Sequence, residues 1–396
     1  MCDSVSCSGL LEWHALVNAL LADFADLARL YYVISIDASS AALLVMVSAS
    51  VMAAKFLAVP AAFALDRAHA PEKFAVPGCA LAALAWTALA AVAGSRKLWT
   101  VTLFFAAECG IVLWSCALDA TRVRTVLQSD AARAQQGRQL AAFFVGTALA
   151  LLLGGGAATL MPPRAVFAVC AVACWCAAAG APPLPSTCEL QPDPEPVHAA
   201  VAKTLRAAAP YALLSNAVLA VPATTDAVVY FLAHTRGFTA MHMGLLGFAT
   251  CVASAAAAVL AEKALARHGR GVVVVAGLVN CAAALALTTL ASASESAERV
   301  PLLVRASAAG LGAAAQTAMC APYAVVVAHE LARRGERRGA VNACLQALGG
   351  LGGVAGVVFT AAMCGEFRVS AGDLSGVLPL LHVVAALTPL PMLVLR

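Results

Sequence analysis

Charged residues are scarce in this sequence. Asp, Glu, Lys and Arg together make up 12% of the 396 residues, whereas about 25% is usual for a soluble domain. Hydrophobic residues make up 62% of the chain, and the mean hydropathy is +0.87. The formal net charge of +4 is spread along the chain, so the basic patch of a nucleic-acid-binding protein is lacking. The composition predicts a polytopic membrane protein that contacts the lipid bilayer and no nucleic acid.

Signatures of catalysis and of metal binding are also lacking. The sequence contains no HExxH and no GxSxG motif, and no set of acidic and histidine residues has the spacing of metal ligands. Most of the 14 cysteines lie inside apolar runs, where cysteine packs as a small hydrophobic residue. We therefore expect no enzymatic active site, no cofactor and no metal site.

What the sequence does contain is a series of long apolar runs. Each run holds about 20 residues, which is enough for a helix to cross the hydrocarbon core of a bilayer. A single segment in lipid satisfies its own backbone only as a helix, so the fold class is all-α. About twelve transmembrane helices are expected, over residues 13–34, 41–65, 75–94, 98–119, 139–161, 164–182, 208–233, 241–265, 271–292, 301–328, 340–363 and 374–395.

A proline-rich and charged segment separates the sixth and seventh of these spans. It favours a cytoplasmic linker over 182–207, between an N-terminal half (1–181) and a C-terminal half (208–396). A weak internal repeat agrees with this division, because AFALDRA (62–68) and AVLAEKA (258–264) end the second and eighth spans. Two parallel six-helix halves are the arrangement of the major facilitator superfamily.

Lysine and arginine predict the orientation. The loops that follow even-numbered spans hold about twice as many of these residues as the loops that follow odd-numbered spans. The positive-inside rule places the richer loops, and with them both termini, in the cytoplasm. The membrane itself, plasma or organellar, is left open.

Ionisable residues inside the predicted spans are the candidate functional residues. Asp23, Asp26 and Arg29 share one broad face of the first span, where Asp26 and Arg29 can pair at i, i+3. The face is either a structural ion pair or a site for substrate or protons that faces a central cavity.

Lys55 and Glu108 have no partner close in sequence. Lys55 is about eleven residues from the expected exit of the second span, which places it near mid-depth at roughly 1.5 Å per residue. It is either a buried partner for Asp26 or Glu108 or an anchor for an anionic substrate.

Two further acids complete the candidates. Asp119 closes the fourth span and can pair with Arg122 at the membrane surface. Asp226 lies in the apolar first half of the seventh span, where a carboxylate either makes a hydrogen bond between helices or lines a polar path.

The segment from 222 to 244 resembles the seventh-span signature of the folate-biopterin transporter family. The matching positions are a proline, an acid, an aromatic pair, a glycine-phenylalanine pair and a further glycine: Pro222, Asp226, Tyr230, Phe231, Gly237, Phe238 and Gly244. Shorter likenesses occur at 25–33, at 116–128 and at 137–157. The chain departs from the family at Ser115, near which the family has an acid, and at Arg124, where it has a glutamate.

The resemblance implies a monomeric secondary transporter of a folate- or pterin-like solute that works by alternating access, with protons as candidate coupling ions. Together with the ionisable residues inside the spans, it gives these candidates for substrate binding or coupling: Asp26, Arg29, Lys55, Glu108, Asp119, Asp226 and Tyr230. Two alternatives remain open. One is a major facilitator transporter with another cargo, and the other is a non-transporting membrane scaffold or a viral or organellar membrane protein.

Overall fold

The structure is a computed structural model that describes residues 4–36, 47, 50, 51, 53–67, 71–92, 97–126, 132–180, 199, 202, 206 and 237–268. These residues form helices and short connections, with no strand among them, in agreement with the predicted all-α class. Most of the linker at 182–207 and the spans predicted at 208–233, 271–292, 301–328, 340–363 and 374–395 lie outside the described residues.

Five of the described helices contain segments that are long and apolar enough to cross a membrane. They are α5 (Ala75–Val92), α6 (Lys97–Val126), α7 (Ala132–Leu160), α8 (Pro163–Gly180) and α11 (Ala240–His268). These helices confirm the third, fourth, fifth, sixth and eighth predicted spans. Both α6 and α7 extend several residues further than predicted, because a helix keeps its internal hydrogen bonds after it leaves the apolar run.

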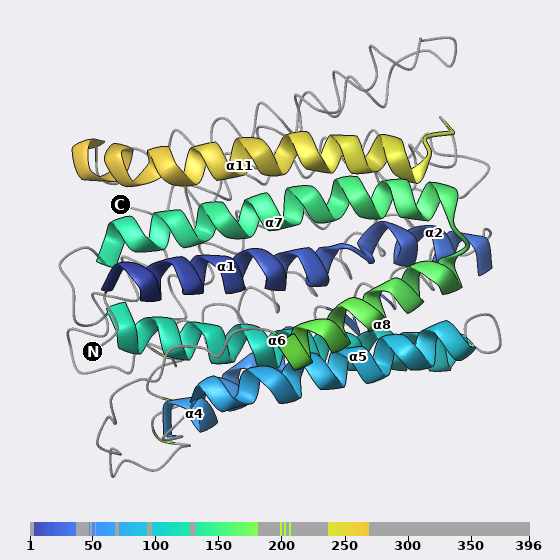
Figure 1. The fold of residues 1–396 in the computed structure, drawn as a ribbon, viewed down its shortest axis with the longest axis horizontal. Coiled ribbons are helices and arrows are strands. Elements are labelled where there is room, and N and C mark those ends of the chain that lie inside the picture. Colours follow the sequence, from blue (N-terminus) through green and yellow to red (C-terminus); the bar gives the residue numbers. More distant parts are fainter. Residues whose placement is uncertain are drawn as a thin grey trace.

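The remaining described elements are shorter. They are α1 (Ser4–Asp23), α2 (Asp26–Ile36), the 3₁₀ turn η1 (Lys55–Leu57), α4 (Ala58–Arg67) and the 3₁₀ turn η2 (Pro71–Phe74). Figure 1 shows α1 and α2 nearly in line, with α7 and then α11 on one side of them and α6 on the other. The first two helices therefore lie in the interior of the described bundle.

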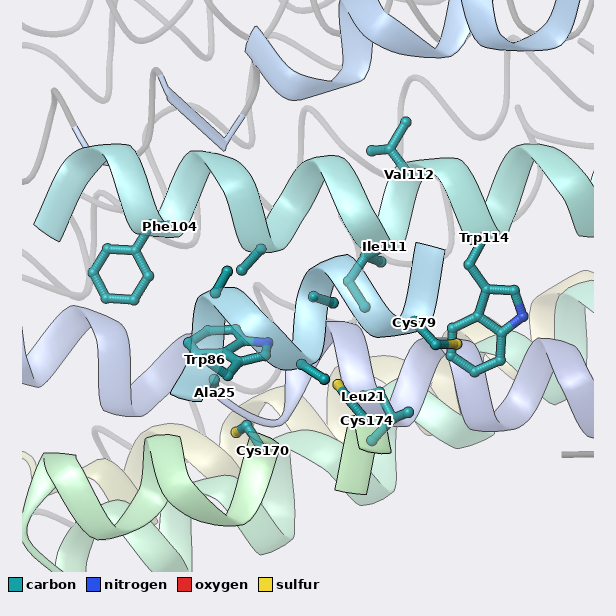
Figure 2. Close-up of a cluster of buried hydrophobic side chains, with 14 of the residues drawn as sticks. Leu21, Ala25, Cys79, Trp86, Phe104, Ile111, Val112, Trp114, Cys170 and Cys174 are labelled. Atoms are coloured by element: carbon teal, nitrogen blue, oxygen red, sulfur yellow. The ribbon is translucent and has the colours of Figure 1, made fainter. Parts of the chain in front are cut away.

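Aromatic rings contribute to the core between α5, α6 and α8, and Figure 2 shows two of them, Trp86 and Phe104, among other buried side chains. The ring centroids of Trp86, Phe104 and Phe167 lie 5.7 to 5.9 Å apart, and Tyr32 adds an edge-on contact at 5.4 Å from Phe167. Aromatic pairs at such distances add to the stabilisation that comes from burial alone. They hold these helices to one another and to α2.

Glycine permits the closest helix contacts. A Cβ atom added to Gly78 on α5 would lie 2.8 Å from the carbonyl oxygen of Gly110 on α6, which is too close for any side chain. Small residues at such positions let transmembrane helices pack with their backbones in contact. The outer surface is different, since large aliphatic side chains such as Leu84, Leu153 and Val172 are exposed where lipid would cover them.

Candidate functional site

The first predicted span is interrupted at its centre. The structure contradicts the expected single helix over 13–34, because α1 ends at Asp23 and α2 begins at Asp26, with a turn at Phe24 and Ala25. The amide of Phe24 still bonds to the carbonyl of Leu20 (3.1 Å), and the helical pattern resumes when the amide of Arg29 bonds to the carbonyl of Ala25 (2.7 Å). Among the described hydrogen bonds, none links the amide of a residue from 25 to 28 to the carbonyl four residues earlier.

The interruption puts two acids in different electrostatic settings. Asp26 occupies the first turn of α2, where the positive end of the helix dipole favours a carboxylate. Asp23 is the last residue of α1, where the negative end of the dipole disfavours a carboxylate.

Asp26 and Arg29 form the predicted ion pair. The guanidinium Nη2 of Arg29 lies 2.7 Å from Oδ1 of Asp26, and its central carbon lies 6.0 Å from the ring centroid of Phe104 on α6. A guanidinium at that distance from an aromatic face is attracted by the ring. The pair is therefore fixed both within α2 and against α6.

Asp23 has a hydrogen-bond partner on another helix. The hydroxyl of Thr147, on α7, donates to Oδ2 of Asp23 at 2.5 Å. Nearby, a side chain on Gly154 of α7 would overlap the carbonyl oxygen of Phe24. The backbone of the interrupted turn thus rests directly on the backbone of α7.

Lys55 and Glu108 join the same region from two further elements. Lys55 begins the 3₁₀ turn η1 and is close enough to both Asp23 and Glu108 to interact electrostatically. Glu108, near the middle of the apolar segment of α6, also interacts with Arg29 and Asp26. We call Asp23, Asp26, Arg29, Lys55 and Glu108 the charge cluster.

A second polar contact lies beside the charge cluster. The hydroxyl of Ser115 on α6 donates to Oδ1 of Asn18 on α1 at 2.9 Å. Asn18 is buried, and its amide nitrogen has no hydrogen-bond partner within the part of the chain that the structure describes. Ser115 therefore joins α6 to α1, two of the elements that carry the charge cluster.

The other predicted site residues are not brought into the cluster. Asp119 is eleven residues after Glu108 on α6, roughly 16 Å along the helix axis. The side chain of its predicted partner Arg122 lies outside the described residues. Asp226 and Tyr230 also lie outside them.

The sequence predicts Asp23 only as part of a helix face, and it predicts neither the Thr147 contact nor the Asn18 contact. The sequence feature that points to this region is the spacing of Asp23, Asp26 and Arg29. A threonine inside an apolar run gives no indication of which helix it faces.

Three residues of the resembled segment have clear structural roles at the start of α11. Gly237 adopts a positive φ of 61°, which glycine tolerates best. The ring of Phe238 is buried, and its carbonyl accepts a 2.7 Å hydrogen bond from the hydroxyl of Tyr31 on α2. Gly244 lets α11 pack against the backbone of α7 at Leu151. These contacts join the first helices of the chain to its eighth predicted span.

The cluster has the chemistry of a binding site. Among the described residues, no group of three His, Cys, Asp or Glu side chains is arranged to hold a metal ion. Five ionisable side chains that converge from α1, α2, η1 and α6 can bind a polar solute or exchange a proton.

Comparison with solved structures identifies the architecture. A variant of the nucleoside transporter NupG superposes with a TM-score of 0.73 over 97% of this chain and 98% of its own, at 12% sequence identity. The human organic anion transporter MFSD10 (TETRAN) superposes with a TM-score of 0.63 over the whole of both chains, at 14% identity.

The chain has the major facilitator fold. No protein-family model and no curated protein sequence matches it. With this fold and its apolar helices, the chain is an integral multi-pass membrane protein. In the order of the major facilitator fold, the charge cluster is carried by the first, second and fourth spans.

Proposed function

We propose that this chain is a secondary transporter that moves a small organic solute across a membrane by alternating access. The observation that carries the proposal is the charge cluster, which lies beside an interrupted helix and includes Glu108 near the middle of the apolar segment of α6. Transporters bind substrates and coupling ions near the bilayer midplane, where helices are discontinuous. A scaffold has no need to hold five ionisable side chains there, since each is costly in hydrocarbon.

The proposed cargo is a folate- or pterin-like compound. The resemblance around Asp226 supports this cargo, and so does the mixture of charges at the site. Lys55 and Arg29 would attract the carboxylates of the solute. Asp26 and Asp226 would accept hydrogen bonds from the pterin ring or take part in proton coupling, and Tyr230 would stack on the ring.

The comparisons suggest two further cargo classes. NupG is a nucleoside transporter and MFSD10 is an organic anion transporter. Nucleosides share a flat, hydrogen-bonding heterocycle with pterins, and folate is itself an organic anion, so one panel of solutes tests all three classes.

The first test is uptake by the purified chain in liposomes. Radiolabelled folate, biopterin and adenosine are supplied with and without an inward proton gradient. We expect at least one to accumulate, and we expect Lys55→Ala to lower the uptake of anionic solutes about tenfold or more, because a buried charge-assisted contact is lost. Lys73→Ala is the matched control, since Lys73 is exposed on η2. No uptake of any solute by correctly folded protein would favour the non-transporting alternative.

Asp226 has its own test in the same assay. Asp226→Asn removes the charge but keeps the size of the side chain, so coupling or ring binding at this position predicts a change in the rate or the pH dependence of uptake. If both stay as in the wild-type chain, Asp226 has neither role.

A further inference from the structure

We propose that Asp23 is the binding site for a coupling cation, either a proton or Na⁺, and this inference rests on the proposed transport function. Asp23 is distinct from the acids that would contact the solute. Charge, helix geometry and hydrogen bonding support the assignment.

The first argument is charge balance. The charge cluster brings three carboxylates, on Asp23, Asp26 and Glu108, to two cations, on Arg29 and Lys55. When all five groups are ionised the cluster has an excess of one negative charge, which is unfavourable in a low-dielectric interior. One bound monovalent cation would make the cluster neutral.

The second argument concerns which acid takes the cation. Asp26 already has Arg29 at 2.7 Å and the positive end of α2 beside it. Glu108 interacts with both Lys55 and Arg29. Asp23 has Lys55 as the only cation among its described electrostatic partners, and it shares that lysine with Glu108.

The third argument is the position of Asp23 on α1. A carboxylate at the last residue of a helix faces the negative end of the helix dipole, so the end of α1 favours a cation at this point. In transporters, the C-terminal ends of half-helices and unwound backbone hold coupling ions. The turn at Phe24 and Ala25 supplies such an end beside Asp23.

Within the described part of the chain, the groups that face Asp23 come from five elements. They are Asp26 on α2, Lys55 on η1, Glu108 on α6, Thr147 on α7 and Cys251 on α11. Thr147 occupies Oδ2 with its 2.5 Å hydrogen bond. The other carboxylate oxygen, Oδ1, is the atom proposed to take the proton or Na⁺.

The proposal makes Asp23 a switch within the cluster. When the cation binds, Lys55 is released from Asp23 and is free to attract the anionic solute together with Arg29. Binding of the cation and binding of the solute would then be cooperative, as a symporter requires.

Infrared spectroscopy of the full-length chain in lipid tests the proton without knowledge of the cargo. A protonated carboxyl group has a carbonyl stretch distinct from that of a carboxylate. We expect a component of this band to grow as the pH falls in the wild-type chain and to be absent in Asp23→Asn. Asp23→Glu should restore it, and Glu12→Gln is the matched control, because Glu12 also lies on α1 and pairs with Arg138 of α7 at 3.3 Å.

Sodium is tested by thermal unfolding in NaCl against choline chloride at equal ionic strength. If Na⁺ is the cation, it should stabilise the wild-type chain and Glu12→Gln but not Asp23→Asn. The assignment is overturned if Asp23→Asn retains both the pH-dependent band and any sodium stabilisation of the wild-type chain, or if the wild-type chain shows neither response.

Uptake measurements distinguish the proposed transport function from the proposed cation site at Asp23. Asp23→Asn should exchange solute across the membrane but lose accumulation above the equilibrium level. Absence of uptake in the wild-type chain would contradict the transport function, while the spectroscopic and thermal responses would still decide whether Asp23 holds a cation.

Discussion

At the scale of single residues, the contact between Asp23 and Thr147 joins α1 to α7 beside the charge cluster. Thr147→Val keeps the shape of the side chain and removes the donor. We expect a loss of about 0.6 kcal/mol, and at most about 1.7 kcal/mol, in the free energy of unfolding, the average and the maximum found for hydrogen bonds between transmembrane helices. Denaturant titration in mixed micelles measures it.

Two variants control for that measurement. Thr147→Ser keeps the hydroxyl and should retain most of the stability. Thr102→Val removes a hydroxyl that bonds within its own helix, to the carbonyl of Leu98 at 3.0 Å on the exposed side of α6. Equal losses from Thr102→Val and Thr147→Val would show that the bond to Asp23 contributes nothing specific.

Residue types and spacing predicted part of the site. The pair Asp26–Arg29 followed from its i, i+3 spacing, whereas the depth of Lys55 in the membrane remains a prediction. The partners Thr147 and Asn18 did not follow, because a contact between helices depends on how each helix is rotated about its axis. Apolar runs as uniform as those of α6 and α7 leave that rotation undetermined.

At the scale of helices, the interruption between α1 and α2 depends on α7. Phe24 turns its carbonyl onto Gly154, where any side chain would overlap it. We expect Gly154→Ala to destabilise the chain by about 1 to 3 kcal/mol, as overpacking in a close-packed interior does. It should also lower transport, because the turn carries Asp23.

Gly156→Ala is the control for this prediction. It lies two residues further along α7, and the nearest atom to an added Cβ is the sulfur of Met241 at 3.9 Å. The two variants have the same change in helix propensity, so equal stabilities would contradict a role for the close approach at Gly154.

The interruption itself could not be predicted from sequence. The residues ALLADFADLARL (19–30) include no proline and no glycine, which are the usual causes of a break in a helix. Here the turn lies beside two tertiary contacts, the close approach to Gly154 and the hydrogen bond from Thr147, and a sequence does not indicate either. The five uninterrupted apolar helices were predicted correctly because a single apolar segment in lipid satisfies its backbone only as a helix.

At the scale of the whole molecule, the positive-inside rule predicts that Lys73 faces the cytoplasm and Arg164 the opposite side. Both side chains are exposed, on η2 and near the start of α8. In intact cells, a membrane-impermeant thiol reagent should label Arg164→Cys. It should label Lys73→Cys only after the membrane is permeabilised.

The chain without either substitution gives the background from its own cysteines. Labelling of Lys73→Cys alone in intact cells would reverse the predicted orientation. The division into halves at 1–181 and 208–396 remains a prediction, since most of the second half lies outside the described residues.

The bond between Tyr31 and residue 238 has a consequence for inherited variation. The hydroxyl of Tyr31 donates to the main-chain carbonyl of Phe238, not to its side chain. Every amino acid carries that carbonyl, so codon changes at 238 leave the acceptor in place and affect only the buried ring. A single nucleotide substitution can change the codon of Tyr31 to one for phenylalanine, and this change removes the hydroxyl that donates the hydrogen bond. Purifying selection on this hydrogen bond should therefore act on position 31.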